Sequence, residues 1–362
     1  MFTRPIPAEP RLDRAKVSET TTELARRREA LLLAAVQEFI ATAAPVGSQQ
    51  ILSRYSLGVK GATVRNMMAE LEEAGYLHQP HTSAGRIPTD KAFRHYVDHL
   101  MGSNQIAFED RAQIELHYSG GTRDLNEIVR DTSRLLAFLT GQAALVMAPR
   151  LEEAKLEQVN FVRVRERQVL GVFAAVGGGV HNRLVETDQD YSQEELDRMA
   201  RYLNESLHGR TLEEARRWIE RQLKEERAAY DRFVRAALTI GGAIAVSPAS
   251  AEVYVEGGAR ALEQPEFSDV GKLRELLRVL DDKSALLDLL EQTVKSGNLT
   301  VSIGSENPDS RLNAFSVIAT SYQSGAMPLG SLAVVGPVRM DYGRVIPLVD
   351  YTAKALSRIL EH

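Results

Sequence analysis

Residues 62–91, ATVRNMMAELEEAGYLHQPHTSAGRIPTDK, decide the fold of the N-terminal part of this chain. Apolar residues recur at helical spacing between 62 and 74, and Gly75 follows where a helix commonly ends in the left-handed conformation. Beyond it, residues 76–79 and 86–87 have the composition of two short strands around a tight loop. The stretch therefore predicts a helix followed directly by a β-hairpin.

Helices are expected on both sides of this stretch. Residues 23–43 carry apolar groups at helical spacing, and a short second helix, capped by Gly47 or Ser48, is expected through Tyr55. A fourth helix is expected over 89–101. The order of helix, helix-turn-helix, hairpin and helix is typical of a winged-helix DNA-binding domain.

The third helix, 62–74, has one face suited to a protein core and one suited to DNA. Its apolar stripe consists of Val64, Met67, Met68 and Leu71. The opposite face combines small residues with Arg65, which can pair with guanine, and Asn66, which can pair with adenine or phosphate. Thr63, at the helix start, can donate to a phosphate. The alternative is an ordinary amphipathic helix with a solvated face.

The candidate DNA-binding residues lie on these elements and in the hairpin loop. They are Ser48, Gln49, Lys60, Thr63, Arg65, Asn66, His81, Thr82, Ser83 and Arg86. The last four belong to the hairpin and suit the phosphate or minor-groove contacts of a wing.

The distribution of charge permits a DNA-binding surface on an acidic chain. The net charge is −5, but residues 1–100 hold 13 Lys and Arg against 11 Asp and Glu. Residues 39–69 and 74–89 contain no carboxylate, and Glu70, Glu72 and Glu73 stand together between them. This segregation favours a local positive face, although a chance gap in acidic residues would look the same.

The rest of the chain predicts an α+β region with two structural units. Helices are expected at 104–118, 122–139, 192–207, 211–238, 269–280, 283–295 and 343–360. Strands are expected at 143–147, 158–165, 168–176, 180–187, 251–255, 299–303, 314–321 and 331–336.

Several kinds of protein and site are disfavoured. The absence of cysteine excludes disulfides and thiolate metal sites. The sequence contains no run of eighteen apolar residues, so no membrane-spanning helix is expected. His95 and His99 are four apart on a helix, but a solvated helix is favoured over a metal site. Gly177–Gly179 lacks the spacing of a phosphate-binding loop, and no GxSxG, HExxH or Walker sequence appears. The chain is therefore not expected to be an enzyme, and no catalytic, cofactor or metal residue is assigned.

Three strings in the first hundred residues closely resemble the heat-inducible transcription repressor family HrcA. They are APVGS at 44–48, ATVRNMMAELE at 62–72 and QPHTSAGRIPTDK at 79–91. The resemblance continues at YVEG (254–257), QPEF (264–267), IGSEN (303–307) and GPVRMDY (336–342), and so covers nearly all of residues 21–360. Gly61, Met67 and Val338 depart from the family's pattern, the first two close to the DNA-facing helix.

The resemblance implies an α+β multidomain architecture. Its expected parts are a winged-helix domain over 21–101, a GAF-like α/β domain over 102–150 and 241–362, and an inserted α+β dimerisation domain over 151–240. Residues 1–20, which have three prolines, scattered charges and no apolar run, are expected to form a disordered tail on composition alone. Four large apolar residues on the predicted helix at 211–238 are expected to supply dimer contacts: Trp218, Leu223, Tyr230 and Phe233.

The function that the resemblance implies is negative regulation of transcription in the cytoplasm. Members bind an inverted-repeat operator called CIRCE as homodimers and repress chaperone operons of the groESL and dnaK type. Heat inactivates them, and the GroEL chaperonin promotes their active form. The alternative is a metabolite-sensing regulator whose GAF-like domain binds a small effector. A pocket with convergent polar groups would favour the effector, whereas an apolar, filled pocket would favour the heat-shock repressor.

Overall fold

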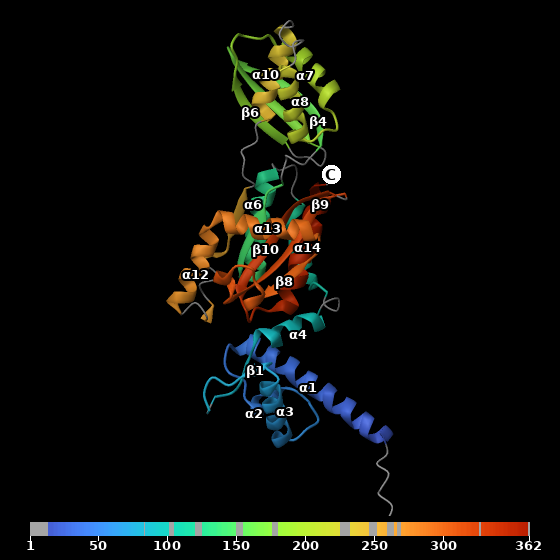
Figure 1. The fold of residues 1–362 in the computed structure, drawn as a ribbon, viewed down its shortest axis with the longest axis vertical. Helices are drawn as coiled ribbons and strands as arrows, with labels where there is room; N and C mark the ends of the chain where they lie inside the picture. The colour runs from blue at the N-terminus through green and yellow to red at the C-terminus, as the bar shows by residue number, and fades with distance from the viewer. Residues whose placement is uncertain are drawn as a thin grey trace, which may run out of the picture. The chain divides into compact units, whose positions relative to one another are not determined.

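The computed structural model (Figure 1) describes residues 14–360 except for a set of short stretches. These stretches are 83, 101–104, 120–124, 150–154, 176–179, 225–231, 246–251, 259–263, 266–268 and 326. Ser83, Tyr230 and Gly177–Gly179 therefore lie outside the described residues. The chain combines helices and sheets and divides into two compact units, one of Met1–Asn104 with Val338–Tyr342 and one of Gln105–Pro337 with Gly343–His362.

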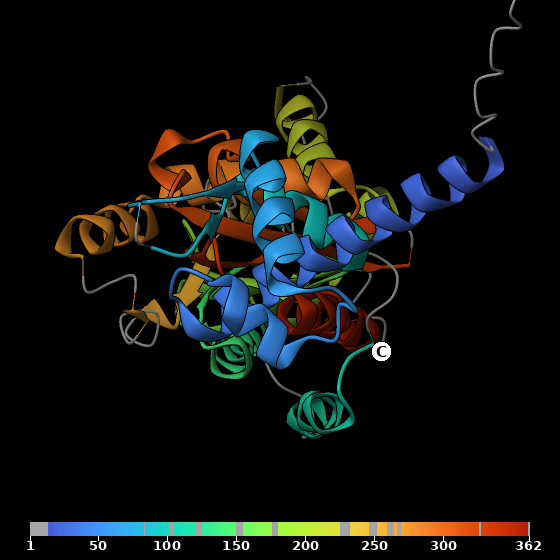
Figure 2. The same cartoon turned by 90° about the horizontal axis from the view of Figure 1, so that it is seen from below.

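The first unit has the predicted order of helix, helix-turn-helix, hairpin and helix. Its elements are α1 (Arg14–Thr42), α2 (Ser48–Arg54), α3 (Gly61–Glu73), β1 (Leu77–His78), β2 (Ile87–Pro88) and α4 (Asp90–Leu100). Gly75 has a φ of 77°, which confirms the left-handed end predicted for α3. α1 begins earlier than predicted, so residues 14–20, expected in a disordered tail, are helical. Figure 2 shows the N-terminal half of α1 extending away from α2 and α3.

The core of the first unit lies where α1, α3 and α4 meet. The buried residues of α1 and α3 include Leu31, Leu32, Ala35, Val36, Val64, Met67, Met68 and Leu71, the last four being the predicted stripe. Phe93 of α4 stands at the centre, since its ring centroid lies 6.2 Å from that of Phe39 and 6.1 Å from that of Tyr342. Aromatic pairs at such separations add to the stability that burial provides.

A five-residue segment from near the C-terminus completes this core. Val338–Tyr342 joins a strand and a helix of the second unit but packs with the first. Met340 and Tyr342 are buried, and Arg339 Nη1 donates to the carbonyl of Ile40 at 3.0 Å. The sequence interpretation placed all of 241–362 in the GAF-like domain, and nothing in local periodicity distinguishes these five residues.

The second unit contains a five-stranded antiparallel sheet with strand order β7-β3-β10-β9-β8. The strands are β3 (Ala143–Met147), β7 (Val253–Glu256), β8 (Thr300–Ile303), β9 (Phe315–Ser324) and β10 (Met327–Pro337). β3 and β7 pair from Ala144 opposite Glu256 to Met147 opposite Val253. Two strands separated by more than one hundred residues of chain are therefore neighbours in one sheet.

Helices cover both faces of this sheet. α12 (Val270–Asp281) and α13 (Lys283–Ser296) bury Leu276 and Leu290 against one face. α6 (Leu125–Thr140) packs against β3 and β7, while α5 (Phe108–Tyr118) and α14 (Tyr342–Leu360) share a cluster with it that includes Ile114 and Leu348. Because both faces are covered, β3 is a continuous apolar run and is buried throughout.

The region between β3 and β7 forms a second sheet with its own helices. It consists of β4 (Leu156–Arg165), β5 (Gln168–Ala175), β6 (Val180–Glu186), α7 (Gln193–Leu207), α8 (Leu212–Lys224) and α10 (Arg232–Ala245). The strand order is β4-β5-β6, with every pair antiparallel, and Leu156, Val159 and Phe161 point toward the helices in one core.

The single helix predicted over 211–238 is wrong. α8 ends at Lys224, and α10 packs back against it, so that a Cβ on Gly242 would lie 3.2 Å from Cγ2 of Ile219. The sequence predicts one helix because apolar residues recur at helical spacing in both α8 and α10. Trp218 and Phe233, predicted to supply dimer contacts, are half-buried and pack against the core of this region, whereas Leu223 is 38% exposed.

Candidate nucleic-acid interface

α3 presents an exposed polar face because its opposite side is anchored in the core. Val64, Met67 and Met68 are almost wholly buried, whereas Arg65 and Asn66 are exposed. Neither the Arg65 side chain nor the Asn66 side chain forms a hydrogen bond or ion pair with another described residue. The same holds for the side chain of Lys60, an exposed residue at the N-cap position of the helix, whose carbonyl accepts from the backbone N–H of Val64. These donors are therefore available to a ligand without breaking an internal contact.

The acidic residues beside this face are largely neutralised. Glu70 pairs with Arg28 of α1 at 2.9 Å, and Glu72 pairs with Arg86 of the hairpin at 2.8 Å. The two pairs remove most of the negative charge of the cluster that the sequence places between two basic stretches. The positive charges of Lys60 and Arg65 are thus left to dominate the exposed face.

A buried carboxylate fixes α2 against α1. Glu38 is 1% exposed, and its oxygens accept from Gln50 Nε2 at 2.5 Å and from Arg54 Nη1 at 3.0 Å. Such charge-assisted bonds are short and directional, so they set the position of the helix that precedes the turn. The sequence carried a signal for this contact, because Glu38 continues the apolar spacing of Leu31 and Ala35 on α1.

The hairpin is held to the rest of the unit through its second strand. Arg86 exchanges both backbone hydrogen bonds with Val46, at 2.8 and 2.9 Å, and Val46 is fully buried. Gly85 must lack a side chain, since a Cβ there would lie 2.6 Å from the Val46 carbonyl. Gln79 Nε2 donates to the carbonyls of Thr82 and Ala84 and closes the loop. The loop is therefore held closed by hydrogen bonds from a side chain of the hairpin itself to backbone carbonyls.

The described candidate residues fall into two groups by exposure. The exposed ones are Gln49, Lys60, Arg65, Asn66, His81 and Thr82. The half-buried ones are Ser48 and Thr63 at helix starts and Arg86, whose guanidinium is already paired with Glu72. Arg86 thus differs from the other basic candidates, because its observed contacts position the hairpin.

One of the two histidines considered for a metal site, His95, has other contacts. His95 stacks edge-on against Tyr76 with ring centroids 5.9 Å apart, and its Nε2 lies 3.7 Å from Glu29. Among the described residues, no three His, Cys, Asp or Glu side chains gather closely enough to hold a metal ion. No helix in the described part of the chain is long and apolar enough to cross a membrane.

Known proteins with similar sequences match this chain over nearly its whole length. The family model described as HrcA protein C terminal domain matches residues 126–346. The heat-inducible transcription repressor HrcA of Geobacter sulfurreducens is 40% identical over 340 residues, which cover 94% of this chain and 99% of that protein. The protein of the same name from Syntrophobacter fumaroxidans is 39% identical, with 94% and 98% covered.

A solved structure shares the fold. A crystal structure described as that of a hypothetical protein superposes with a TM-score of 0.65 at 27% sequence identity. The match covers 92% of this chain and 98% of that one.

Proposed function

Because the chain belongs to the HrcA family of heat-inducible transcription repressors, we propose that it represses chaperone operons by binding an inverted-repeat CIRCE operator. The relatives are transcription repressors and not enzymes. The observation that carries the proposal is the exposed pair Arg65 and Asn66 on a helix whose other face is buried. A cytoplasmic location follows from the proposed contact with DNA.

In this proposal the first unit is a winged helix and α3 lies in the major groove. Arg65 donates two hydrogen bonds to a guanine, and Asn66 bonds an adenine or a phosphate. Thr63 and Lys60, at the N-terminus of α3, contact the backbone phosphates, where the helix dipole favours negative charge.

The remaining candidates support the docked helix. Ser48 and Gln49 contact phosphates from the start of α2, and His81, Thr82 and Ser83 form the tip of the wing. Arg86 keeps the wing in place through Glu72, and it can reach DNA only by leaving that ion pair.

An electrophoretic shift assay tests the DNA-binding proposal. The full-length protein is titrated against a CIRCE-like inverted repeat and against a scrambled duplex of the same composition, at one fixed salt concentration. Specific proteins of this kind bind their sites about 10³-fold or more tighter than other DNA. Equal affinity for the two duplexes would refute operator recognition.

We further propose that the region between β3 and β7 dimerises the protein, so that two wings meet two half-sites. Two-fold symmetry of the protein would then match the symmetry of the operator. The support is an apolar row across the outer face of the inserted sheet, where Val162, Leu170 and Leu184 are cross-strand neighbours. Val162 and Leu184 are 46% and 51% exposed, which is unusual for a sheet face that meets only water.

The proposed heat switch follows from the topology of the five-stranded sheet. β3 and β7 pair across more than one hundred residues, and such non-local pairing folds slowly and leaves apolar strands exposed meanwhile. The exposed groups would include Val301, Ile303, Val317, Ile318, Val334 and Val335. A chaperonin that captures apolar surface would then return the chain to its active form, and its occupation by heat-damaged proteins would release the operons.

The switch is tested by heating the purified protein, cooling it, and assaying operator binding with and without GroEL and ATP. The proposal requires a larger recovery with the chaperonin. Equal recovery in both samples would exclude a chaperonin-dependent switch.

A further inference from the structure

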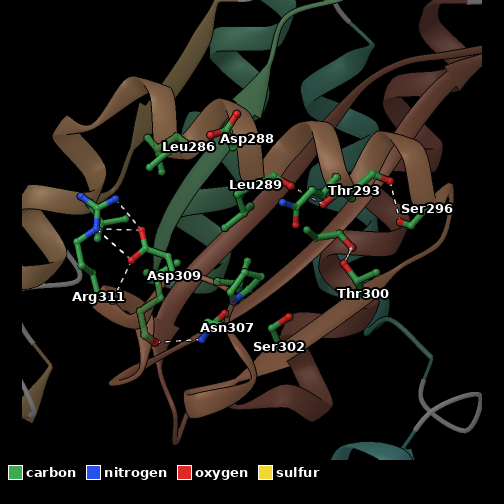
Figure 3. A pocket seen from close by; sticks show the side chains of 17 residues that line it. Leu286, Asp288, Leu289, Thr293, Ser296, Thr300, Ser302, Asn307, Asp309 and Arg311 are labelled. Atoms are coloured by element: carbon green, nitrogen blue, oxygen red, sulfur yellow. Dashed lines mark hydrogen bonds and ion pairs between the residues drawn. The ribbon is translucent and has the colours of Figure 1, made fainter.

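The second unit contains a pocket of about 430 Å³ between α13 and the β8–β9 edge of the five-stranded sheet (Figure 3). Its volume is in the range of sites that hold small organic ligands. It shares no residue with the candidate DNA-binding set.

The middle of the pocket is apolar. Leu286 and Leu289 of α13, together with Val317 and Ala319 of β9, line it. These side chains offer a surface on which a ligand's hydrocarbon part would be removed from water.

The polar atoms at one end of the pocket are mainly hydrogen-bond acceptors. Thr293, Ser296 and Thr300, which lie together in Figure 3, donate their hydroxyl protons to the carbonyls of Leu289, Thr293 and Ala319. A hydroxyl whose one proton is already donated can still accept a hydrogen bond through its oxygen lone pairs.

Asn307 adds an acceptor that has no partner. It is 6% exposed and lines the pocket, and its Nδ2 donates to the carbonyls of Gly304, Leu312 and Phe315. Its Oδ1 is buried and has no hydrogen-bond partner among the described residues. An unsatisfied buried acceptor is uncommon in folded proteins and is costly unless a donor reaches it.

The charged groups of the lining are net negative. Arg311 lines the pocket, and its Nη2 binds Asp309, which also lines it, at 2.6 Å; its Nη1 binds Asp282, which lies outside the lining, at 3.0 Å. Asp288 also lines the pocket and pairs with no other described residue. The field in the pocket therefore favours a cation.

We propose that this pocket binds a small organic cation that has N–H donors on an apolar body, such as a primary ammonium. The donors meet the hydroxyl and amide acceptors, the hydrocarbon lies on the leucine surface, and the positive charge balances the carboxylates. The partly polar lining is what a small-molecule site requires, and such a site would add a ligand to the repressor function proposed above. This inference does not depend on DNA binding.

Three probes with the same ring and different heads test the inference: cyclohexanemethylamine, cyclohexanemethanol and cyclohexanecarboxylate. Binding to the full chain is measured by isothermal titration calorimetry at neutral pH. We expect the ammonium to bind with a dissociation constant of roughly 1 mM or tighter, as befits a ligand of this size. It should bind about tenfold tighter than the carboxylate, with the alcohol between them.

Variants localise the binding. Ser302→Leu, on the edge strand β8, fills the pocket and should abolish ammonium binding, while Asp288→Asn should weaken it about two- to fivefold. Asp281→Asn makes the same chemical change at an exposed position outside the lining and should leave the affinity unchanged. No detectable ammonium binding, equal binding of the carboxylate, or unchanged affinity in Ser302→Leu would each overturn the inference.

Discussion

At the scale of single residues, the first unit contains charged and polar side chains that hold two elements together and others that form no hydrogen bond or ion pair with a described residue. Glu38, Arg28 and Arg86 each hold one element against another. Arg65, Asn66 and Lys60 make no such contact among the described residues. Substitutions of the second group should therefore change binding and leave the fold intact.

Replacing Arg65 by alanine is expected to cost about 1–3 kcal/mol of operator affinity and to relax specificity at one base position. The measurement is the affinity for operator and for random duplexes at fixed salt. Arg274→Ala, which removes an exposed arginine of α12, is the matched control and should bind like the parent. Unchanged operator affinity in a folded Arg65→Ala variant would show that α3 does not read the bases.

Lys60→Ala should affect DNA affinity differently from Arg65→Ala, because it should weaken binding to every sequence. A lysine that contacts phosphate contributes equally on every sequence, so operator and random DNA should both weaken by a similar factor. The slope of log affinity against log salt should also fall by about one, because one fewer counterion is released. A loss confined to the operator would instead assign Lys60 to base recognition.

At the scale of elements, two features stand out: the outer face of one sheet and the junction between two helices. The outer face of the β4-β5-β6 sheet is apolar along one cross-strand row. The junction of α12 and α13 is capped by Asp282, whose Oδ1 accepts from the backbone N–H of Ala285 at 3.2 Å and whose Oδ2 accepts from Arg311.

Leu184→Asp should dissociate the proposed dimer, because a carboxylate in the middle of an apolar interface must lose its water. Sedimentation velocity measures the change in mass, and operator affinity should fall with it. Glu186→Asp, on the same strand, retains the negative charge and should remain dimeric. If Leu184→Asp sediments as the parent does, another surface joins the two copies.

Acid should weaken the α12–α13 junction. The backbone N–H of Ala285 first, and then the Arg311 guanidinium, hold the pKa of Asp282 below its usual range. A lowered pKa in the folded state means that the stabilisation is present above the unfolded-state pKa and is lost as the pH falls through the folded-state pKa. In Asp282→Asn, amide exchange at the start of α13 should depend less on acidic pH than in the parent. An identical acid dependence in the two proteins would contradict the assignment.

At the scale of the whole molecule, the two units are not two consecutive pieces of chain. Val338–Tyr342 lies between β10 and α14 yet belongs to the core that contains α1 and α4. Tyr342 is fully buried beside Phe93, and its hydroxyl donates to the carbonyl of Val338 at 2.6 Å. The first unit therefore depends on residues that follow the sheet of the second unit.

Tyr342→Ala should destabilise the first unit by about 3–5 kcal/mol, the usual cost of removing a buried aromatic ring. Hydrogen exchange locates the effect: amides of α1 and α4 should lose protection, while those of β9 and β10 should keep it. Arg339→Ala, which removes only the bond to the Ile40 carbonyl, should act in the same place but cost about 1 kcal/mol. Loss of protection confined to β9 and β10 would assign the segment to the other unit.

The sequence by itself determined many of the elements, among them α3 and its exposed face. Helical spacing of Val64, Met67 and Leu71 fixed which side is buried, and Gly75 fixed where the helix ends, because both depend on residues close in the chain. The family strings added the expected function. β3, β5 and α13 were placed to within about a residue for the same local reasons.

Only the tertiary structure decided which charges are available and which distant segments meet. The pairing of Glu70 with Arg28 and of Glu72 with Arg86, the turn that returns α10 onto α8, and the place of Val338–Tyr342 all join residues far apart in sequence. The polar pocket under α13 likewise requires β8, β9 and the Asn307 loop at once. Periodicity describes the faces of one element, but complementary packing and charge between elements determine which partner each face meets.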